Sequence, residues 1–235
     1  MTASPASRIF VSIDTPEIES ARTLASQVAG IVGGIKLGLE FFVAQGPAGI
    51  RAVVSGVDLP LFLDLKLHDI PNTVAASVRS VLPLQPGFLT LHAGGGPAMM
   101  RAAAEAAAMT DLGRPKLLGV TVLTSLDEDD LIAVGQTVPV LDQVRRLAAL
   151  AQSSGLDGVV CSPAEVAALR SDCGPDFVLM VPGIRPAGSA IGDQKRVMTP
   201  RDAVGQGADY LVIGRPITQA PNPAQAAMSI VEELT

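Results

Sequence analysis

The sequence is poor in aromatic residues: it contains no tryptophan, one tyrosine and six phenylalanines. Because 48% of its residues are nevertheless hydrophobic, the core must be built mainly from alanine, valine, leucine and isoleucine. No apolar run approaches the roughly 18–20 residues needed to cross a bilayer. The first residues also lack the basic and apolar regions of a signal peptide. We therefore expect neither membrane insertion nor a membrane partner.

Cysteine and histidine are equally scarce, with two of each among 235 residues. Cys161 and Cys173 form neither a CxxC pair nor a Cys/His group, which argues against a zinc site or a disulfide framework. We expect both thiols to serve packing in a reducing cytoplasm. We expect His68 to face solvent and His92 to be a neutral structural residue, so a histidine-based metal site is not predicted.

Positive charge is in deficit, because 17 lysines and arginines oppose 23 acidic residues and leave a net charge of −6. Nucleic acids and anionic membranes attract basic surfaces, so an acidic protein is a poor partner for either. An anionic small substrate would need a local basic pocket.

What the sequence does contain is a repeated unit: a short apolar strand, a polar or glycine-rich turn, and a helix rich in alanine and leucine. Strands are expected at 8–14, 33–38, 61–67, 88–93, 117–124, 158–162, 177–183 and 210–215. Helices are expected between them, for example at 16–30, 72–84, 97–109, 140–155, 163–170 and 222–235. This alternation predicts an α/β fold, a (β/α)8 TIM barrel in one domain over residues 1–235. A doubly wound open sheet is the competitor, but the glycine-rich dinucleotide turn after its first strand is missing.

Charged residues interrupt one strand candidate, in the stretch LFLDLKLHDIPNTV at residues 61–74. Successive strand residues point to opposite faces, so Phe62, Asp64 and Lys66 share one face and leucines occupy the other. The acid and the base would lie about 6–7 Å apart along the strand. A buried ion pair that helps only the fold is the alternative, but such pairs stabilise weakly and are costly to bury. We therefore favour a functional role.

Two further charges belong with this pair. Asp69 follows the strand, and Lys36 lies near the end of the strand expected at 33–38. Function in a barrel gathers where the strands end, so two acids and two bases would converge on one mouth and hold each other charged. Such a set suits a reaction in which a carboxylate leaves and a carbanion gains a proton.

A basic, glycine-containing segment closes the last strand, in IGRPI at residues 213–217. Gly214 would let backbone approach a phosphate, and Arg215 would supply a bidentate fork. The long loop at 184–198 could act as a lid, with Arg185 and Gln194 closing on the same phosphate. A solvated loop charge is the alternative for Arg185, and for Gln194 the two interpretations are balanced.

Three weaker candidates lie at other strand ends. Asp14 could accept a sugar hydroxyl, but physical reasoning alone favours capping of the helix that starts near Pro16. Thr124 and Ser125 could bond a polar ring or merely start a turn.

The stretch DLKLHDIPNT resembles the signature Asp-x-Lys-x-x-Asp-Ile-(Pro or Gly)-x-Thr of the orotidine 5′-phosphate decarboxylase family. The resemblance covers nearly the whole chain and extends to SIDT, IKLG, VTVLTS, PGIRP…DQKR and IGRPI. The length and the order of motifs are similar to those of the short bacterial form.

The resemblance implies a homodimeric enzyme that converts orotidine 5′-phosphate to UMP, the last step of de novo pyrimidine nucleotide biosynthesis, without a metal or cofactor. It implies that Lys66 protonates C6 as CO₂ leaves and that Asp64 lies against the substrate carboxylate. Lys36 and Asp69 would complete a charged tetrad. Further implied contacts are Asp14 and Lys36 to the ribose; Thr124, Ser125 and Pro182 around the pyrimidine; Arg185, Gln194, Gly214 and Arg215 to the phosphate; and Asp69, Ile70 and Thr73 reaching into the site of the partner subunit.

Two alternatives stay open. One is a Mg²⁺-dependent sugar-phosphate lyase or aldolase of the same barrel superfamily, whose members usually lack the Ile-Pro-x-Thr continuation. The other is a nucleotide-binding barrel without catalysis, against which the intact set of charges argues.

Overall fold

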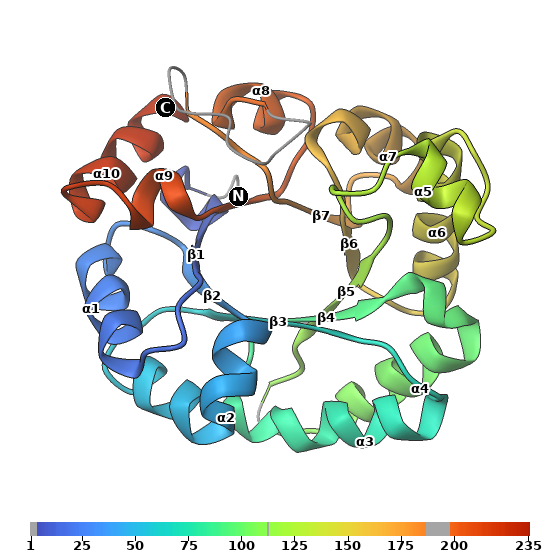
Figure 1. The fold of residues 1–235 in the computed structure, drawn as a ribbon, viewed down its shortest axis with the longest axis horizontal. Coiled ribbons are helices and arrows are strands. Elements are labelled where there is room, and N and C mark those ends of the chain that lie inside the picture. The colour runs from blue at the N-terminus through green and yellow to red at the C-terminus, as the bar shows by residue number, and fades with distance from the viewer. Residues whose placement is uncertain (1–3, 112, 187–197) are drawn as a thin grey trace.

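The computed structural model describes residues 4–111, 113–186 and 198–235. Figure 1 shows an inner ring of strands surrounded by helices. In the described chain, eight parallel strands pair in sequence order, and the pairing of the first with the last closes the sheet into a barrel. The strands are β1 (Ile9–Ile13), β2 (Gly34–Gly38), β3 (Leu61–Leu67), β4 (Phe88–His92), β5 (Lys116–Val120), β6 (Gly158–Val160), β7 (Val178–Val181) and β8 (Tyr210–Ile213). The predicted (β/α)8 barrel is confirmed.

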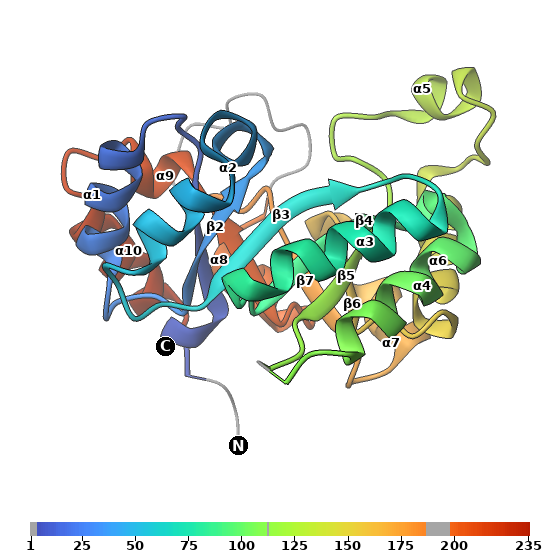
Figure 2. The ribbon, with the colours of Figure 1, turned by 90° about the horizontal axis from the view of Figure 1, so that it is seen from below.

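Helices connect consecutive strands and cover the outside of the barrel (Figure 1). The described α-helices are α1 (Ile18–Val28), α2 (Leu39–Val54), α3 (Pro71–Val81), α4 (Gly96–Ala108), α5 (Glu128–Ala133), α6 (Val140–Ser153), α7 (Val166–Cys173), α8 (Pro200–Gly205), α9 (Arg215–Thr218) and α10 (Pro223–Glu233). Short 3-10 helices occupy Ala6–Arg8, Leu82–Leu84, Ala93–Gly95 and Pro163–Glu165. In the side view of Figure 2, α5 stands apart from the other helices.

Several elements end earlier than the sequence predicts. The strand expected at 117–124 stops at Val120, where its pairing with β6 ends. The strand expected at 210–215 stops at Ile213, because Gly214 leaves the extended conformation and Arg215 begins α9. Proline explains a break inside α2, where Gly46 has φ 60° and Pro47 cannot donate a helical hydrogen bond.

The strands divide the core into an interior and an outer layer. Inside the barrel, Phe10, Phe62 and Phe88 contact one another edge to face. Phe10 and Phe88 also contact Tyr210, and the Phe88 and Tyr210 centroids are 5.0 Å apart. Gly34 makes room for this cluster, because a Cβ there would lie 2.2 Å from the Phe10 ring. Leucine, isoleucine and valine on the opposite strand faces pack against the helices. The interior is therefore filled near the amino ends of the strands, and the polar side chains lie at the carboxyl ends of the strands.

Arg170 of α7 ties together the amino ends of β7 and β8. Its guanidinium donates to the carbonyls of Gly174, Phe177 and Gly207 and to the carboxylate of Asp209, at 2.6–3.2 Å. The same Asp209 carboxylate accepts the backbone N–H of Leu179 at 2.8 Å. One side chain thus satisfies polar groups at the end of the barrel remote from the charged strand ends.

We expect Arg170→Met to lower the free energy of unfolding by about 2–4 kcal/mol, because several half-buried acceptors lose a charged donor while the aliphatic stem is kept. Urea denaturation measures the change. Arg145→Met is the matched control, since Arg145 makes a similar fork with Asp172 on the exposed surface and should cost much less. Equal losses in the two variants would contradict the role given to Arg170.

Candidate active site

The carboxyl ends of the strands surround a cavity of about 530 Å³. Nine of the residues singled out in the sequence line it, namely Asp14, Lys36, Asp64, Lys66, Thr124, Pro182, Arg185, Gly214 and Arg215. They come from β2, β3 and the segments that follow β1, β5, β7 and β8. The prediction that polar residues at the strand ends would meet is confirmed for this group.

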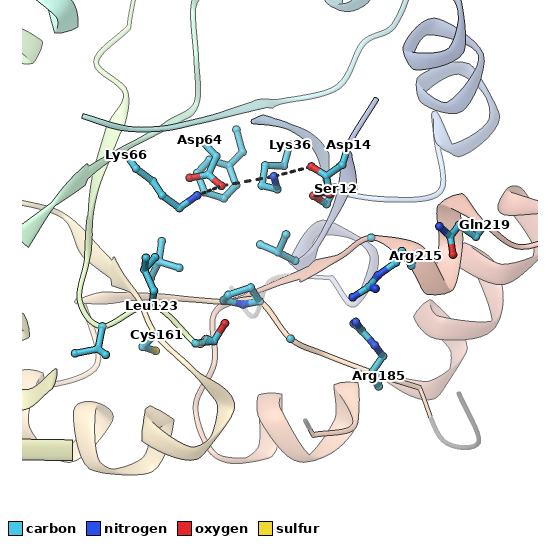
Figure 3. A pocket seen from close by; sticks show the side chains of 18 residues that line it. Ser12, Asp14, Lys36, Asp64, Lys66, Leu123, Cys161, Arg185, Arg215 and Gln219 are labelled. Carbon is cyan, nitrogen blue, oxygen red and sulfur yellow. Dashed lines mark hydrogen bonds and ion pairs between the residues drawn. The ribbon is translucent and has the colours of Figure 1, made fainter. Parts of the chain in front are cut away.

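A chain of opposite charges crosses one wall of the cavity (Figure 3). Lys66 Nζ lies 2.7 Å from Asp64 Oδ2, and Lys36 Nζ lies 3.5 Å from the same oxygen. Lys36 Nζ also donates to Asp14 Oδ1 at 3.3 Å. The order Lys66, Asp64, Lys36, Asp14 alternates in sign, so each ammonium adjoins a carboxylate.

Asp64 is the most constrained member of this chain. Its carboxylate is buried, with 12% of the side chain exposed, and it also accepts a hydrogen bond from Thr90 at 2.9 Å. Burial by itself would raise the pKa of Asp64, but the charges of Lys36 and Lys66, helped by hydrogen bonds from Lys66 and Thr90, hold that pKa below 3.8. The carboxylate therefore stays ionised at neutral pH.

The two charges on β3 are closer than a regular strand implies. The pairing of β3 with β4 shifts register between Leu63 and Leu67, and the backbone of Lys66 has φ 50°. The side chains consequently meet in a direct ion pair rather than standing apart along the strand. Lys66 remains accessible, with 29% of its side chain exposed.

Asp14 does not cap the helix that follows it, so that alternative is wrong. Helix α1 begins at Ile18, and no side chain caps its N-terminus. Asp14 instead accepts a hydrogen bond from the Ser12 hydroxyl at 2.9 Å and one from Lys36. It is the outermost group of the charged chain, with 59% of its side chain exposed.

Two arginines lie across the cavity from Lys66. Arg185 follows β7 and Arg215 follows β8, and their guanidinium groups point toward one another in Figure 3. Gly214 brings backbone close to β1, because a Cβ there would lie 3.3 Å from Cβ of Ser12. The cavity thus has a wall of paired charges and, opposite, a region of concentrated positive charge.

Other predicted residues do not reach this cavity in the single chain. Asp69, Ile70 and Thr73 are exposed, and the Asp69 carboxylate accepts the backbone N–H of Ile70 at 2.6 Å. Asp69 and Ile70 border a second, shallower depression with His68, Pro71, Gly94 and Gly95. Ser125 is exposed beside Thr124 and does not line the cavity. Gln194 lies outside the described residues.

The sequence profile described as "Orotidine 5'-phosphate decarboxylase / HUMPS family" matches residues 7–230. The chain belongs to this family.

Individual members are similar to the chain over almost its whole length. "Orotidine 5'-phosphate decarboxylase" of Rhodospirillum rubrum is 56% identical over 238 residues, which cover 100% of this chain and 95% of that protein. The protein of the same name from Paramagnetospirillum magneticum is 57% identical, covering 96% of this chain and 97% of its own. Among solved structures, orotidine 5'-phosphate decarboxylase from Lactobacillus acidophilus aligns with a TM-score of 0.85 and 36% identity, over 97% of this chain and 98% of that one.

Sequence reasoning missed three polar residues of this decarboxylase-family site. Ser12 lies two residues before Asp14, and Gln219 lies one helical turn after Arg215; both line the cavity. Thr90 shares a strand face with Phe88 and His92, so its inward orientation was open to prediction. The contact of Thr90 with Asp64 could not be predicted, because it joins residues of different strands.

An apolar wall completes the site, with Leu123, Val160 and Cys161 among its members. Burial and the nearby Glu165 raise the pKa of the Cys161 thiol well above 9.0, so it is uncharged at neutral pH. Both cysteines are free.

The two histidines pack against each other near the charged residues of β3. Burial, together with the charges of His68 and Lys66, lowers the pKa of His92 below 6.5, which keeps the ring neutral at neutral pH as expected. His68 is exposed, as expected, although its ring also packs against His92 with centroids 5.3 Å apart.

Within the described ranges, no three His, Cys, Asp or Glu side chains gather as a metal-binding group. In the same part of the chain, no helix combines the length and apolarity that a membrane crossing requires.

Proposed function

We propose that this chain decarboxylates orotidine 5′-phosphate to UMP, the last step of de novo pyrimidine nucleotide biosynthesis, without a metal or cofactor. The observation that carries the proposal is the 2.7 Å contact between Lys66 Nζ and Asp64 Oδ2 at the cavity wall, facing two arginines across the cavity. The names of the relatives that cover the whole chain support the same substrate.

The chemistry requires stabilisation of an electron pair. When the bond between C6 and the carboxylate breaks, CO₂ leaves and the electron pair remains on C6, where no π-system is aligned to accept it. The Lys66 ammonium, fixed beforehand by Asp64, stabilises this charge as it develops and needs no reorganisation during the step. A proton then passes from Lys66 Nζ to C6, and solvent returns the lysine to its ammonium form.

Asp64 serves two purposes in this scheme. It holds Lys66 in place, and it lies against the substrate carboxylate, whose departure removes a repulsion between like charges. Lys36 offsets part of the negative charge that Asp64 and the substrate carboxylate bring together. With Asp14, it is also positioned to bond the ribose hydroxyls. Thr124 bonds the pyrimidine edge, and Pro182 closes the wall beside the ring.

The 5′-phosphate binds between Arg185 and Arg215. Two guanidinium groups that point toward one another define a space for an anion, and the backbone of Gly214 approaches the same region. Gln194, from the segment after Arg185, adds a further donor. Because the reaction needs the upper part of the ~8–23 kcal/mol that enzymes commonly supply, binding energy from this remote group must help to organise the charged wall.

The alternatives differ in what they require of the charged wall. A Mg²⁺-dependent lyase would need carboxylates free to bind the ion, whereas Asp64 is bonded to two lysines and Thr90. A binding protein without catalysis would have no use for an exposed ammonium held against a buried carboxylate.

We expect Lys66→Ala to lower kcat for orotidine 5′-phosphate by at least about 10⁴-fold while UMP still binds, because the proton donor is lost but the phosphate site is kept. Loss of orotate absorbance measures turnover, and calorimetry measures UMP binding. Lys116→Ala is the control, since Lys116 lies at the start of β5, remote from the cavity.

Three outcomes would contradict this proposal. Turnover by Lys66→Ala within about tenfold of the wild type would reject the role of Lys66. Loss of wild-type activity after dialysis against EDTA, restored by Mg²⁺, would favour the lyase. UMP binding by a wild-type protein that leaves orotidine 5′-phosphate unchanged would favour the binding protein.

We expect Arg215→Ala to act through the phosphate alone. It should lower kcat/KM for orotidine 5′-phosphate by about 10- to 150-fold, which corresponds to ~1.5–3 kcal/mol for a charged hydrogen bond. Orotidine, which lacks the phosphate, should react equally slowly with variant and wild type. A parallel loss with both substrates would show that Arg215 does not bind the phosphate; Arg22→Ala, on the exposed face of α1, is the control.

A homodimer completes the site in this proposal. Asp69, Ile70 and Thr73 are exposed at the start of α3 and do not reach the cavity of their own chain. Ile70 has 66% of its surface exposed, so its side chain is accessible to a partner. A two-fold axis would place these residues in the cavity of a second copy, and the same residues of the second copy would enter the cavity of the first.

We expect Lys66→Ala and Asp69→Ala homodimers each to be nearly inactive and their mixture to recover. A hybrid dimer has one site with both defects and one with neither, so random exchange should restore about a quarter of all sites. The measurement is turnover after subunit exchange verified by mass spectrometry. Turnover that stays at the level of the parents would place Lys66 and Asp69 in the same chain's site.

We also propose that the protein acts in the cytoplasm as a single domain. Both cysteines are free, which suits a reducing compartment. Recovery of the protein in the membrane or extracellular fraction of its cells would contradict this location.

A further inference from the structure

The backbone of Lys66 is in an unfavourable conformation. Its φ is 50°, in the left-handed region that lysine rarely adopts. A residue in this state persists only where its surroundings hold it. Glycine and asparagine adopt this conformation more readily than lysine does. The support for Lys66 must therefore come from a neighbouring element.

The pairing of β3 with β4 locates the support. Leu63 pairs with Leu89 and Leu67 pairs with Leu91, so three residues of β3, Asp64 to Lys66, stand opposite one residue of β4. That residue is Thr90, whose surface is 0% exposed. The extra length of β3 forms a bulge, and the bulge contains both charged side chains.

One hydroxyl spans the bulge. Thr90 Oγ1 accepts the backbone N–H of Lys66 at 2.9 Å and donates to Asp64 Oδ1 at 2.9 Å. These directions are obligatory, because an N–H can only donate and an ionised carboxylate can only accept. The other carboxylate oxygen, Oδ2, receives Lys66 Nζ at 2.7 Å. The backbone and the side chain of Lys66 are thus both fixed relative to the same carboxylate.

We propose that Thr90 is a positioning residue for the reaction: its hydroxyl holds the β3 bulge so that the Lys66 ammonium stays against Asp64 and is directed into the cavity. This inference rests on the proposed role of Lys66 as proton donor. Removal of the hydroxyl leaves a buried N–H without its acceptor and frees Asp64 Oδ1, so the bulge can relax and move the ammonium away from C6. A displacement of about 1 Å at a reacting group can cost about 100-fold in rate.

The test compares Thr90→Val and Thr90→Ala, which lack the hydroxyl, with Thr90→Ser, which keeps it. We expect the first two to lower kcat by about 10- to 100-fold with KM and the Kd of UMP within about threefold of wild type, because the phosphate site is untouched. Thr90→Ser should retain kcat within about threefold. Thr121→Val is the matched control, since this buried threonine donates its hydroxyl to the Val160 carbonyl instead of to a carboxylate.

The outcomes separate this inference from the proposed function. If the wild type does not convert orotidine 5′-phosphate, both fail. If the wild type is active and a folded Thr90→Val or Thr90→Ala protein keeps its kcat, the inference alone fails. It also fails if Thr90→Ser loses as much kcat as the other two, or if KM rises as far as kcat falls. Circular dichroism and melting curves identify the folded variants, and the comparison of serine with alanine decides the matter if the valine variant does not fold.

Discussion

The ion pairs of Asp64 are the interaction on which the rest of the site depends. A carboxylate inside a barrel wall loses its hydration, and this loss must be offset by charges and donors of the protein. Lys36, Lys66 and Thr90 supply that compensation from three consecutive strands. In return, Asp64 fixes two ammonium groups in a cavity where they would otherwise repel each other. The charges therefore stabilise one another as a set, so the loss of one would alter the surroundings of the others.

The barrel separates this charged set from the elements that hold the fold together. Phe10, Phe62, Phe88 and Tyr210 fill the interior near the amino ends of the strands. Arg170 and Asp209 tie together the amino ends of β7 and β8. None of these groups lines the cavity at the carboxyl ends of the strands except Phe62. Stability and chemistry consequently draw on different ends of the same strands, as is common in this fold.

Local patterns were sufficient to predict the barrel and most of the cavity. Strand and helix periodicity located all eight strands of the described chain, and the rule that function gathers at strand ends placed Lys36, Asp64 and Arg215 together. The bulge in β3 was not predictable, because a register shift is defined only against the partner strand. The capping interpretation of Asp14 failed for the same reason: the neighbouring strand brings Lys36 within reach, and no local rule contains that contact. What the sequence conceals is the set of contacts between strands.

Closure of the sheet has a consequence for synthesis on the ribosome. Val11 of β1 pairs with Ile213 of β8, so the barrel cannot close until nearly the whole chain has been translated. At about 5–20 residues per second, roughly 10–40 s separate the synthesis of these two partners. The nascent sheet has two open edges during that time, and open edges invite pairing with other chains. Gly214 and Arg215 directly follow the closing strand, so the part of the cavity that they line is made last, long after the charges on β2 and β3.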